Sequence, residues 1–418
     1  MDEKSLYTRF LGIGSPWRVT AVLLDDAVGE VRVHVEHRSN RVCACPMCGK
    51  RVPRYDKRHR SWRHLDSCQY KTIVTAEVPR VNCSEHGVLQ VPVPWAEPGS
   101  GLTAMLEASV IDLLKEASIT AVARHLRLSW DAVDGVIQRA VARGLKRRTT
   151  TAAPHLSVDE TSFQKRHEYV TVVADAHSGA VLHVADARTT ESLQEYYTQL
   201  SDQQREGIES VSMDMWDAYI TATRTHVPDA DRKICFDKYH VASYLGRAVD
   251  TTRRAEHRHL IGIGDERLKK TRFLWLQNPH TMSDKQSSRF EELRTSSLKT
   301  AEAWGLKELA MDLWQYVHPA WARKAWNNWI ALAQASQLPA IEKVAHTIET
   351  HLWGIVNAIV LARTNAIAES INSRIQKLKA RACGYRNRTR FRNAIYFYCG
   401  KLDLYPDSYQ PFCAHTVN

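Results

Sequence analysis

The sequence has no long apolar run and no recognisable secretion signal at its start. No stretch approaches the roughly 20 consecutive apolar residues that a membrane-spanning helix needs. After Met1 the next three residues, Asp2, Glu3 and Lys4, are charged, and the N-terminus lacks the apolar core of a signal peptide. The nine cysteines are not evenly spaced, as they would be in a disulfide-stapled secreted domain. We therefore expect a cytoplasmic protein with no membrane partner.

Acidic side chains are also in short supply. The chain has 46 Asp and Glu residues against 57 Lys and Arg residues, which gives a net charge of +11 and a pI near 9.2. An excess of this size favours a polyanionic partner. Because a membrane partner is not expected, nucleic acid is the favoured one. At 418 residues the chain is too long for one ordinary hydrophobic core, so two to four domains are expected.

Cysteine and histidine residues concentrate between positions 43 and 86. Thiolates and imidazoles in two tight turns suit tetrahedral Zn²⁺, and ordinary buried thiols are the alternative. Cys43 and Cys68 remain alternative ligands. We predict a zinc site in an N-terminal domain, residues 1–95. Two short pairs, each followed by a glycine that permits a sharp turn, supply the favoured ligands: Cys45, Cys48, Cys83 and His86.

Residues 92–101 are rich in proline and glycine and are expected to form a linker. Beyond them, helical periodicity at 106–114 and a short segment at 118–126 precede a third helix that Ser129 is placed to cap. This order is the helix-turn-helix pattern, which we place at 102–150, and a plain helical hairpin is the alternative. The side chains expected to meet DNA are Arg124, Ser129, Gln138, Arg139 and Arg143.

From about residue 154 the pattern alternates between strands and helices. Three antiparallel strands followed by helix, strand, helix and strand is the order of a ribonuclease-H-like sheet. The sequence thus predicts an α+β multidomain protein with an α/β catalytic core that begins at 154–240. The expected strands are 156–162, 169–175, 180–187, 210–215 and 233–236, and the expected helices are 190–204 and 216–226.

Three acidic residues stand where phosphodiester chemistry would need them. Asp159 and Asp214 each end a short apolar strand, and Glu369 lies in a helical stretch before a basic segment. Mg²⁺ is bound by a few carboxylates together with water and substrate phosphate. Two such ions can activate a nucleophile and stabilise a leaving oxygen. We therefore predict that Asp159, Asp214 and Glu369 bind two Mg²⁺ or Mn²⁺ ions.

Neighbouring residues compete for these roles. Glu160 competes with Asp159, and Asp217 lies one turn after Asp214. Asp237 follows the last expected strand and is either an auxiliary ligand or a cap for the next helix. We expect Glu160, Asp237 and His240 to lie near the site as auxiliary residues.

A helical segment and a basic segment complete the chain. Residues 241–362 are expected to form an all-helical insertion, whose seven tryptophans suit core positions better than stacking on an unpaired base. Residues 374–392 hold eight Lys and Arg residues and no acid, which favours phosphate contacts over a merely solvated face. The predicted contacts are Lys377, Lys379, Arg381, Arg386, Arg388, Arg390 and Arg392.

Six blocks of the sequence are distinctive when taken together: Val158–Thr161, Ser212–Met215, Cys235–His240, Arg363–Asn372, Gly384–Asn387 and Phe391-Arg392. They resemble the ISL-three family of bacterial insertion-sequence transposases, and the resemblance covers nearly the whole chain. The sequence departs from the family pattern at Thr364-Asn365, where the family has Ser-Asn, and at Ser370, where it often has glycine.

The resemblance implies a DDE transposase with an N-terminal zinc-binding region, a helix-turn-helix and a catalytic domain interrupted by helices, which would resume at 363–418. It implies the triad Asp159, Asp214 and Glu369 and the same four zinc ligands. It also implies that the protein acts at the bacterial nucleoid on double-stranded DNA. There it would cut the terminal inverted repeats of its element and transfer their 3′-hydroxyl ends to target DNA. Holding two ends requires a homodimer or a larger assembly.

Two other functions remain open at the level of sequence. One is a ribonuclease-H-like nuclease or resolvase, which hydrolyses DNA without strand transfer. The other is a zinc and helix-turn-helix regulator whose catalytic core has decayed.

Overall fold

The computed structural model describes residues 2–38, 42–149, 152–164, 168–277, 281–363 and 366–409. The chain divides into two compact units. The first comprises Met1–Arg148 with Leu402–Asn418, and the second comprises Thr149–Lys401. The last described segment of the chain therefore belongs to the same unit as the N-terminal domain.

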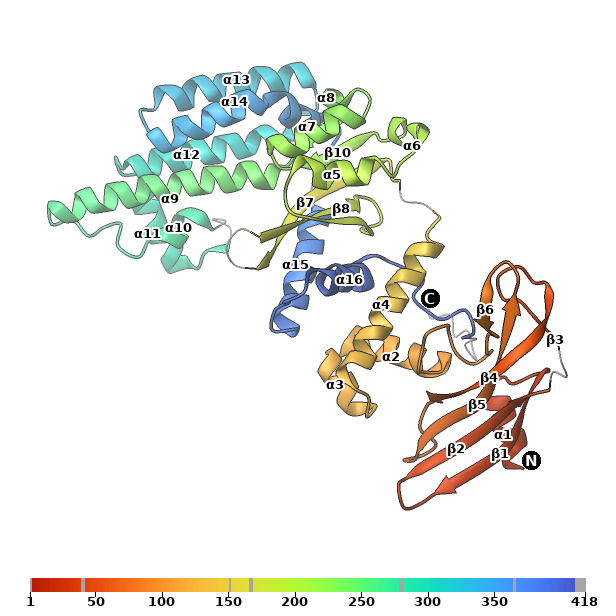
Figure 1. The fold of residues 1–418 in the computed structure, drawn as a ribbon. Coiled ribbons are helices and arrows are strands. Elements are labelled where there is room, and N and C mark those ends of the chain that lie inside the picture. The colour runs from red at the N-terminus through yellow and green to blue at the C-terminus, as the bar shows by residue number, and fades with distance from the viewer. Residues whose placement is uncertain are drawn as a thin grey trace. The chain divides into compact units, whose positions relative to one another are not determined.

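A six-stranded sheet forms the start of the first unit (Figure 1). Its strands run in the order β1-β2-β5-β4-β3, and β6 pairs with β5. Apolar residues on one face, such as Val33 and Val74, are fully buried and pack with Tyr7, Trp62 and Trp95 in one core. The elements are α1 (Glu3–Phe10), β1 (Trp17–Asp25), β2 (Glu30–His37), β3 (Val42–Ala44), β4 (Arg51–Arg63), β5 (Lys71–Cys83) and β6 (Gly87–Gln90).

Three helices follow in the same unit: α2 (Ala104–Glu116), α3 (Ile119–His125) and α4 (Trp130–Arg147). Each begins at a hydroxyl side chain that accepts a hydrogen bond from a backbone amide of the first turn. These capping residues are Thr103, Ser118 and Ser129, so the structure has the predicted helix-turn-helix order and the predicted cap at Ser129.

The segment after Lys401 packs along α4. Arg147 forms an ion pair with Asp403 (2.9 Å) and donates to the carbonyl of Tyr405 (2.7 Å). A side chain on Gly144 would place its Cβ 2.6 Å from Cβ of Leu402, so only glycine permits this close approach. The C-terminal segment is thus built into the helix-turn-helix unit.

A buried histidine joins the end of β4 to the start of α2. His64 is 5% exposed, and its Nδ1 lies 2.8 Å from the hydroxyl of Thr103, the residue that caps α2. Burial, helped by the charge of Arg63, lowers the pKa of His64 to about 4. The neutral ring is therefore the folded form at neutral pH.

This histidine makes the stability of the first unit depend on pH. Between pH 6.5 and pH 4 the unfolded histidine binds a proton that the folded one does not, so stability falls as pH falls through this window. At pH 5 the loss is about 2 kcal/mol. Hydrogen exchange of α2 amides, corrected for intrinsic rates, should show this loss in the native protein and much less of it in His64→Gln. An identical pH dependence in both proteins would contradict the assignment.

The second unit is built on a five-stranded sheet in the order β11-β10-β7-β8-β9. Strands β7, β8 and β9 are antiparallel, whereas β10 is parallel to both β7 and β11. The helix predicted at 190–204 is two short helices, because Ser201 starts a second capping box. The elements are β7 (His155–Gln164), β8 (Glu168–Asp175), β9 (Val181–Asp186), α5 (Thr190–Tyr197), α6 (Asp202–Glu206), β10 (Ser210–Met213), α7 (Asp217–His226), α8 (Ala230–Lys233) and β11 (Ile234–Phe236).

Helices cover both faces of this sheet (Figure 1). One face shares a core with α5, α7 and the helices between β11 and α15, where Trp275, Trp326 and Trp329 are buried. Ile375 and Phe391 from the last two helices pack on the other face. No helix in the described ranges is long and apolar enough to span a bilayer. The helices are α9 (Lys238–Gly262), α10 (Arg272–Leu276), α11 (Asp284–Arg294), α12 (Lys299–Asp312), η2 (Leu313–Gln315), α13 (Pro319–Ala335), α14 (Pro339–Val360), α15 (Ala366–Arg381) and α16 (Arg388–Cys399).

Candidate catalytic and metal-binding sites

Two glycine-terminated turns form the metal-binding candidate in the first unit. After β3, the amide of Cys45 donates to Lys50 (2.8 Å) and the amide of Gly49 donates back to Cys45 (2.9 Å). At the end of β5, Cys83 pairs with Gly87 across a tight hairpin. Gly49 and Gly87 have φ of +69° and +68°, a conformation that favours glycine and lets each turn present its side chains to one point.

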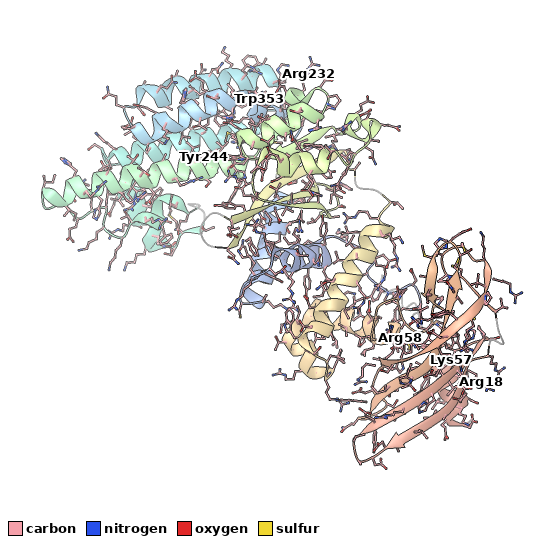
Figure 2. The ribbon with its side chains drawn as sticks, viewed as in Figure 1. Arg18, Lys57, Arg58, Arg232, Tyr244 and Trp353 are labelled. Atoms are coloured by element: carbon pink, nitrogen blue, oxygen red, sulfur yellow. The ribbon has the colours of Figure 1, made fainter. Side chains whose placement is uncertain are left out.

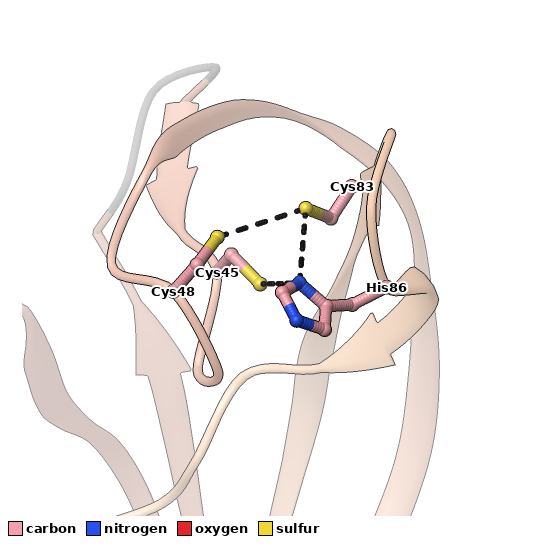
Figure 3. Close-up of side chains that lie close together, drawn as sticks. All are labelled: Cys45, Cys48, Cys83 and His86. Atoms are coloured by element: carbon pink, nitrogen blue, oxygen red, sulfur yellow. Dashed lines mark hydrogen bonds between the residues drawn. The ribbon is translucent and has the colours of Figure 1, made fainter.

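The four predicted ligands meet between these turns (Figure 3). Sγ of Cys48 lies 3.8 Å from Sγ of Cys83, and Nδ1 of His86 lies 3.6 Å from Cys83 Sγ and 3.9 Å from Cys45 Sγ. A zinc tetrahedron with bonds of about 2.0–2.3 Å has edges of roughly 3.6–3.8 Å. The residues therefore fit Zn²⁺ in both chemistry and size.

Within this cluster Cys83 is the thiol whose protonation suits a metal. The pKa of Cys48 is raised instead: the hydrogen bond from the Lys50 backbone lowers it, but desolvation and the thiols of Cys45 and Cys83 outweigh that effect. The hydrogen bond with His86 lowers the pKa of the Cys83 thiol to about 6, and backbone amides contribute. A thiolate is the form that binds metal. Cys43 packs in an apolar cluster with Val81, and Cys68 is exposed elsewhere, so neither alternative ligand is part of the group.

The sheet of the second unit aligns three aspartates, one on β7 and one directly after each of the neighbouring strands β10 and β11. Ser212 of β10 lies opposite Ser157 of β7, so Asp214, two residues later, is level with Asp159. The register between β10 and β11 makes Asp237 level with Asp214 on its other side. Adjacent strands are about 4.8 Å apart, so this order places the three aspartates side by side at one level across the strands.

Asp159 is held by a hydrogen bond from the last part of the chain. Its Oδ2 accepts from the side-chain amide of Asn372 on α15 (2.7 Å). Burial raises the pKa of Asp159 to about 6, and the charges of Asp214 and Asp237 add to the shift while His240 opposes it. Asp159 is therefore in a cluster of like charges, which a structural role would not require.

Asp214 follows β10 and is oriented by two residues of α9. Its Oδ1 accepts from the amide of Met215 (2.7 Å) and from the hydroxyl of Tyr244 (3.2 Å). Nδ1 of His240 lies 3.7 Å from the same oxygen. Because His240 and Tyr244 are four residues apart on one helix face, α9 presents both to Asp214.

Glu369 lies in the first turn of α15 and is exposed. Partial burial and the charge of Asp237 raise its pKa, and His240 opposes the shift, so Glu369 belongs to the same electrostatic cluster. Asn372 lies three residues further along the same helix. Among the described residues, only the Cys and His quartet has its ligand atoms within 4.8 Å of one another, so the three acids do not form a closed cage.

The auxiliary candidates are near the cluster in different ways. Glu160 forms an ion pair with Arg188 (2.9 Å), whose guanidinium lies 4.1 Å from the ring centre of Trp216. Burial raises the pKa of Glu160. Asp237 is buried at the N-cap position of α9 and makes no side-chain capping bond there. Asp217, the competitor of Asp214, is exposed.

Two residues at the cluster were not singled out from the sequence. Asn372 and Tyr244 hold Asp159 and Asp214, respectively. Helical spacing could have identified both residues. Asn372 follows Glu369 by three residues and Tyr244 follows His240 by four, so each lies on the same helix face as a predicted site residue. The Thr364-Asn365 pair of the sequence motif lies outside the described residues.

Two arginines predicted to contact DNA form internal ion pairs. Arg139 and Arg143 bind the fully buried Glu107 of α2, at 2.8 and 2.7 Å. A carboxylate buried to this extent needs compensating cations. The side chain of Arg143 is 9% exposed, so it holds α2 to α4 and does not present its guanidinium to a phosphate. Gln138 donates to Asp134 within α4 (2.7 Å).

The remaining predicted DNA contacts divide in the same way. Arg124, Lys377, Arg386 and Arg390 are exposed. Ser129 caps α4 in the first unit. In the second unit, Lys379 donates to Ser162 (2.6 Å), Arg381 lies over Tyr398, Arg388 pairs with Glu168 (3.1 Å), and Arg392 lies 3.8 Å from Asp186.

Three models of protein families match the chain. A transposase model, of the DDE type in ISL3, matches residues 156–395, which is more than half of the chain and contains the three acids. A model described as the helix-turn-helix domain of transposase family ISL3 matches residues 91–141. A model described as the zinc-finger of transposase IS204/IS1001/IS1096/IS1165 matches residues 41–86, which contain the four cluster residues.

Curated proteins from two bacteria are similar to this chain. The transposase for insertion sequence element IS1001 of Bordetella parapertussis is 28% identical over 356 residues, covering 84% of this chain and 87% of that protein. The transposase for insertion sequence element IS1557 of Mycobacterium tuberculosis is 29% identical over 391 residues, covering 87% of each.

Proposed function

The chain belongs to the ISL3 family of insertion-sequence transposases, enzymes that cut and transfer DNA, and we propose that Asp159, Asp214 and Glu369 are its catalytic acids. The observation that carries this proposal is the shared level of Asp159 and Asp214 on neighbouring strands, with Asn372 joining Asp159 to the helix that bears Glu369. The protein would bind the terminal inverted repeats of its element, cut them and join the 3′-hydroxyl ends to target DNA.

We further propose a ribonuclease-H-like core. Its support is the strand order β11-β10-β7-β8-β9, with three antiparallel strands followed by two parallel ones. On this view the core is formed by 154–240 and by the chain from 363, and the helices at 241–362 are an insertion between them. The zinc-binding domain, 1–95, and the helix-turn-helix, 102–150, precede the core. The segment from Leu402, within the proposed 363–418 part, groups by its contacts with the helix-turn-helix unit.

The residues of the cluster would divide the work between binding and orientation. Two Mg²⁺ ions, held by Asp159, Asp214 and Glu369, would supply charge neutralisation and nucleophile activation. Asn372 fixes the carboxylate plane of Asp159, and Tyr244 and His240 fix that of Asp214. Positioning of this kind is a large part of phosphodiester catalysis. Glu160, paired with Arg188, is a supporting residue in this proposal.

DNA binding follows from the helix-turn-helix and transposase domains. We propose that Arg124 and the exposed start of α4 meet the terminal repeats, and that Lys377, Arg386 and Arg390 contact phosphates near the catalytic acids. A homodimer or larger assembly would hold the two ends together. With bacterial element DNA as its substrate, the protein would act in the cytoplasm, at the nucleoid.

Strand transfer tests this function directly. A duplex carrying one element end, with a labelled 3′-hydroxyl strand, is incubated with the full-length protein, target DNA and Mg²⁺. We expect labelled target DNA, and no product with excess chelator. Cut strands without joined product would instead support a nuclease or resolvase. End binding with neither product would support a regulator with an inactive core.

A further inference from the structure

The helix that orients Asp214 also has a basic outer face. Helix α9 has two acidic residues, and both are engaged inside the unit. Asp250 accepts from Arg253 (2.8 Å) and lies 3.7 Å from Arg272, while Glu256 accepts from the amides that start α12, at Lys299 and Thr300 (2.8 Å each). The acids of α9 thus stabilise its own packing and its contact with α12.

Three arginines of α9 lie on the solvent-exposed side of the helix. Arg247, Arg254 and Arg258 are exposed, on the side opposite Val241, Leu245 and the other buried residues of the helix. Their nearest partners are on α9 itself: carbonyls for Arg247 and Arg258, and Asp250 (3.4 Å) for Arg254. We refer to Arg247, Arg254 and Arg258 as the α9 stripe.

The α9 stripe is in line with the catalytic cluster. His240, Arg247 and Arg254 are spaced by seven residues, which is two helical turns, so they lie on one face with a drift of only about 20° per step. Tyr244, labelled in Figure 2, lies at the end of α9 nearest the sheet, and the helix runs outward from there. The Arg247 guanidinium lies over the Tyr244 ring, 4.9 Å from the ring centre. The stripe therefore begins beside a residue that donates a hydrogen bond to Asp214.

We propose that the α9 stripe binds the phosphates of the duplex DNA that flanks the bond cut at the acid cluster. This inference rests on the proposed function, because it takes the cluster as the place of cleavage. From His240 to Arg258 the helix rises roughly 27 Å, the length of about eight base pairs. A solvated basic face needs no such alignment. Glu256 is engaged with α12, and Asp250 is shared among Arg253, Arg254 and Arg272. The α9 stripe therefore keeps a net positive charge that a polyanion can use.

Salt-dependent binding tests the proposal. Two duplexes carry the element end: one continues about ten base pairs beyond the cleavage site, and the other stops at it. Arg247→Gln/Arg254→Gln/Arg258→Gln is compared with the native full-length protein. For the longer duplex, log affinity should fall less steeply with log salt in the variant. The magnitude of the negative slope should decrease by roughly 2 to 3, because each arginine accounts for one phosphate contact. For the shorter duplex, native and variant slopes should agree.

Matched variants separate a phosphate contact from a general effect. Arg323→Gln/Lys324→Gln/Lys343→Gln removes the same charge from exposed positions on α13 and α14 and should leave both slopes unchanged. The triple lysine variant of the stripe should keep the native slope, because lysine also binds phosphate.

Three results would overturn the inference while leaving the proposed function in place. The first is an equal salt slope for the native protein and the glutamine variant on the longer duplex. The second is a loss of slope in the α13 and α14 variant as large as that in the glutamine variant. The third is a lysine variant whose slope is that of the glutamine variant. A native protein that neither binds nor cuts element ends would overturn the proposed function itself.

Discussion

Asp214→Asn is expected to reduce DNA cleavage by roughly a thousandfold or more while leaving the binding of element ends intact. Asparagine has the same shape as aspartate, and its side-chain oxygen can still accept the hydrogen bonds from the Tyr244 hydroxyl and the Met215 backbone amide. It lacks the negative charge. Loss of a metal-binding charge removes several kcal/mol of transition-state stabilisation, and about 4 kcal/mol corresponds to a thousandfold in rate. Single-turnover cleavage of a labelled end measures the effect, and a mobility-shift titration measures binding.

Asp217→Asn is the matched control for this variant. Asp217 lies three residues later, is exposed, and sits in the first turn of α7, so it is not a member of the row of aspartates. Its substitution removes the same charge and should leave the cleavage rate within a factor of a few. Equal losses in the two variants, or full activity in Asp214→Asn, would remove Asp214 from the catalytic set.

Cys45→Ser is expected to cause the second large effect, the loss of zinc and of the folded N-terminal sheet around it. Cys45 is 1% exposed and offers one of the four candidate ligand atoms of the cluster. Binding of structural Zn²⁺ contributes about 10–16 kcal/mol in small zinc domains, which is as large as the whole stability of a typical domain, about 5–15 kcal/mol. Zinc content per chain should drop from one towards zero, and hydrogen exchange of β3, β5 and β6 amides should become fast.

Cys68→Ser provides the comparison in the same domain. Cys68 is exposed and is not part of the cluster, so its substitution should preserve one zinc per chain and the slow exchange of β5. Adding a strong chelator to the native protein should reproduce the Cys45→Ser exchange pattern. Retained zinc in Cys45→Ser would show that the cluster has been assigned wrong ligands.

Local patterns in the sequence were sufficient for many elements of the fold. Alternation of apolar residues predicted β7 and β8 within one or two residues, and the hydroxyl before an apolar stripe predicted the cap of α4 at Ser129. The two cysteine and histidine pairs were found for a similar reason, because their spacing and glycines are local signals. The single helix expected at 190–204 is two helices, because Ser201 is itself a cap and starts the second one.

Local sequence patterns gave no information about contacts between residues far apart in the chain. The sequence pattern alone predicts that Arg143 is an exposed cation of an amphipathic helix. In the structure it forms an ion pair with Glu107, 36 residues earlier in the chain. The contact of Arg147 with Asp403 joins positions 256 residues apart. Likewise, the hydrogen bond from Asn372 to Asp159 depends on α15 packing on the sheet, which no periodicity indicates. These contacts decide which cations are available to DNA and how the acids are held.

Iron-directed cleavage of the protein chain tests the central claim most directly. Fe²⁺ can replace Mg²⁺ at oxygen ligands, and with ascorbate and peroxide it cuts the backbone near where it is bound. The three-acid account predicts cuts close to residues 159, 214 and 369 together, suppressed by excess Mg²⁺ and absent in Asp214→Asn. Cuts at only one of these segments, or a pattern unchanged in Asp214→Asn, would contradict a metal site shared by Asp159, Asp214 and Glu369.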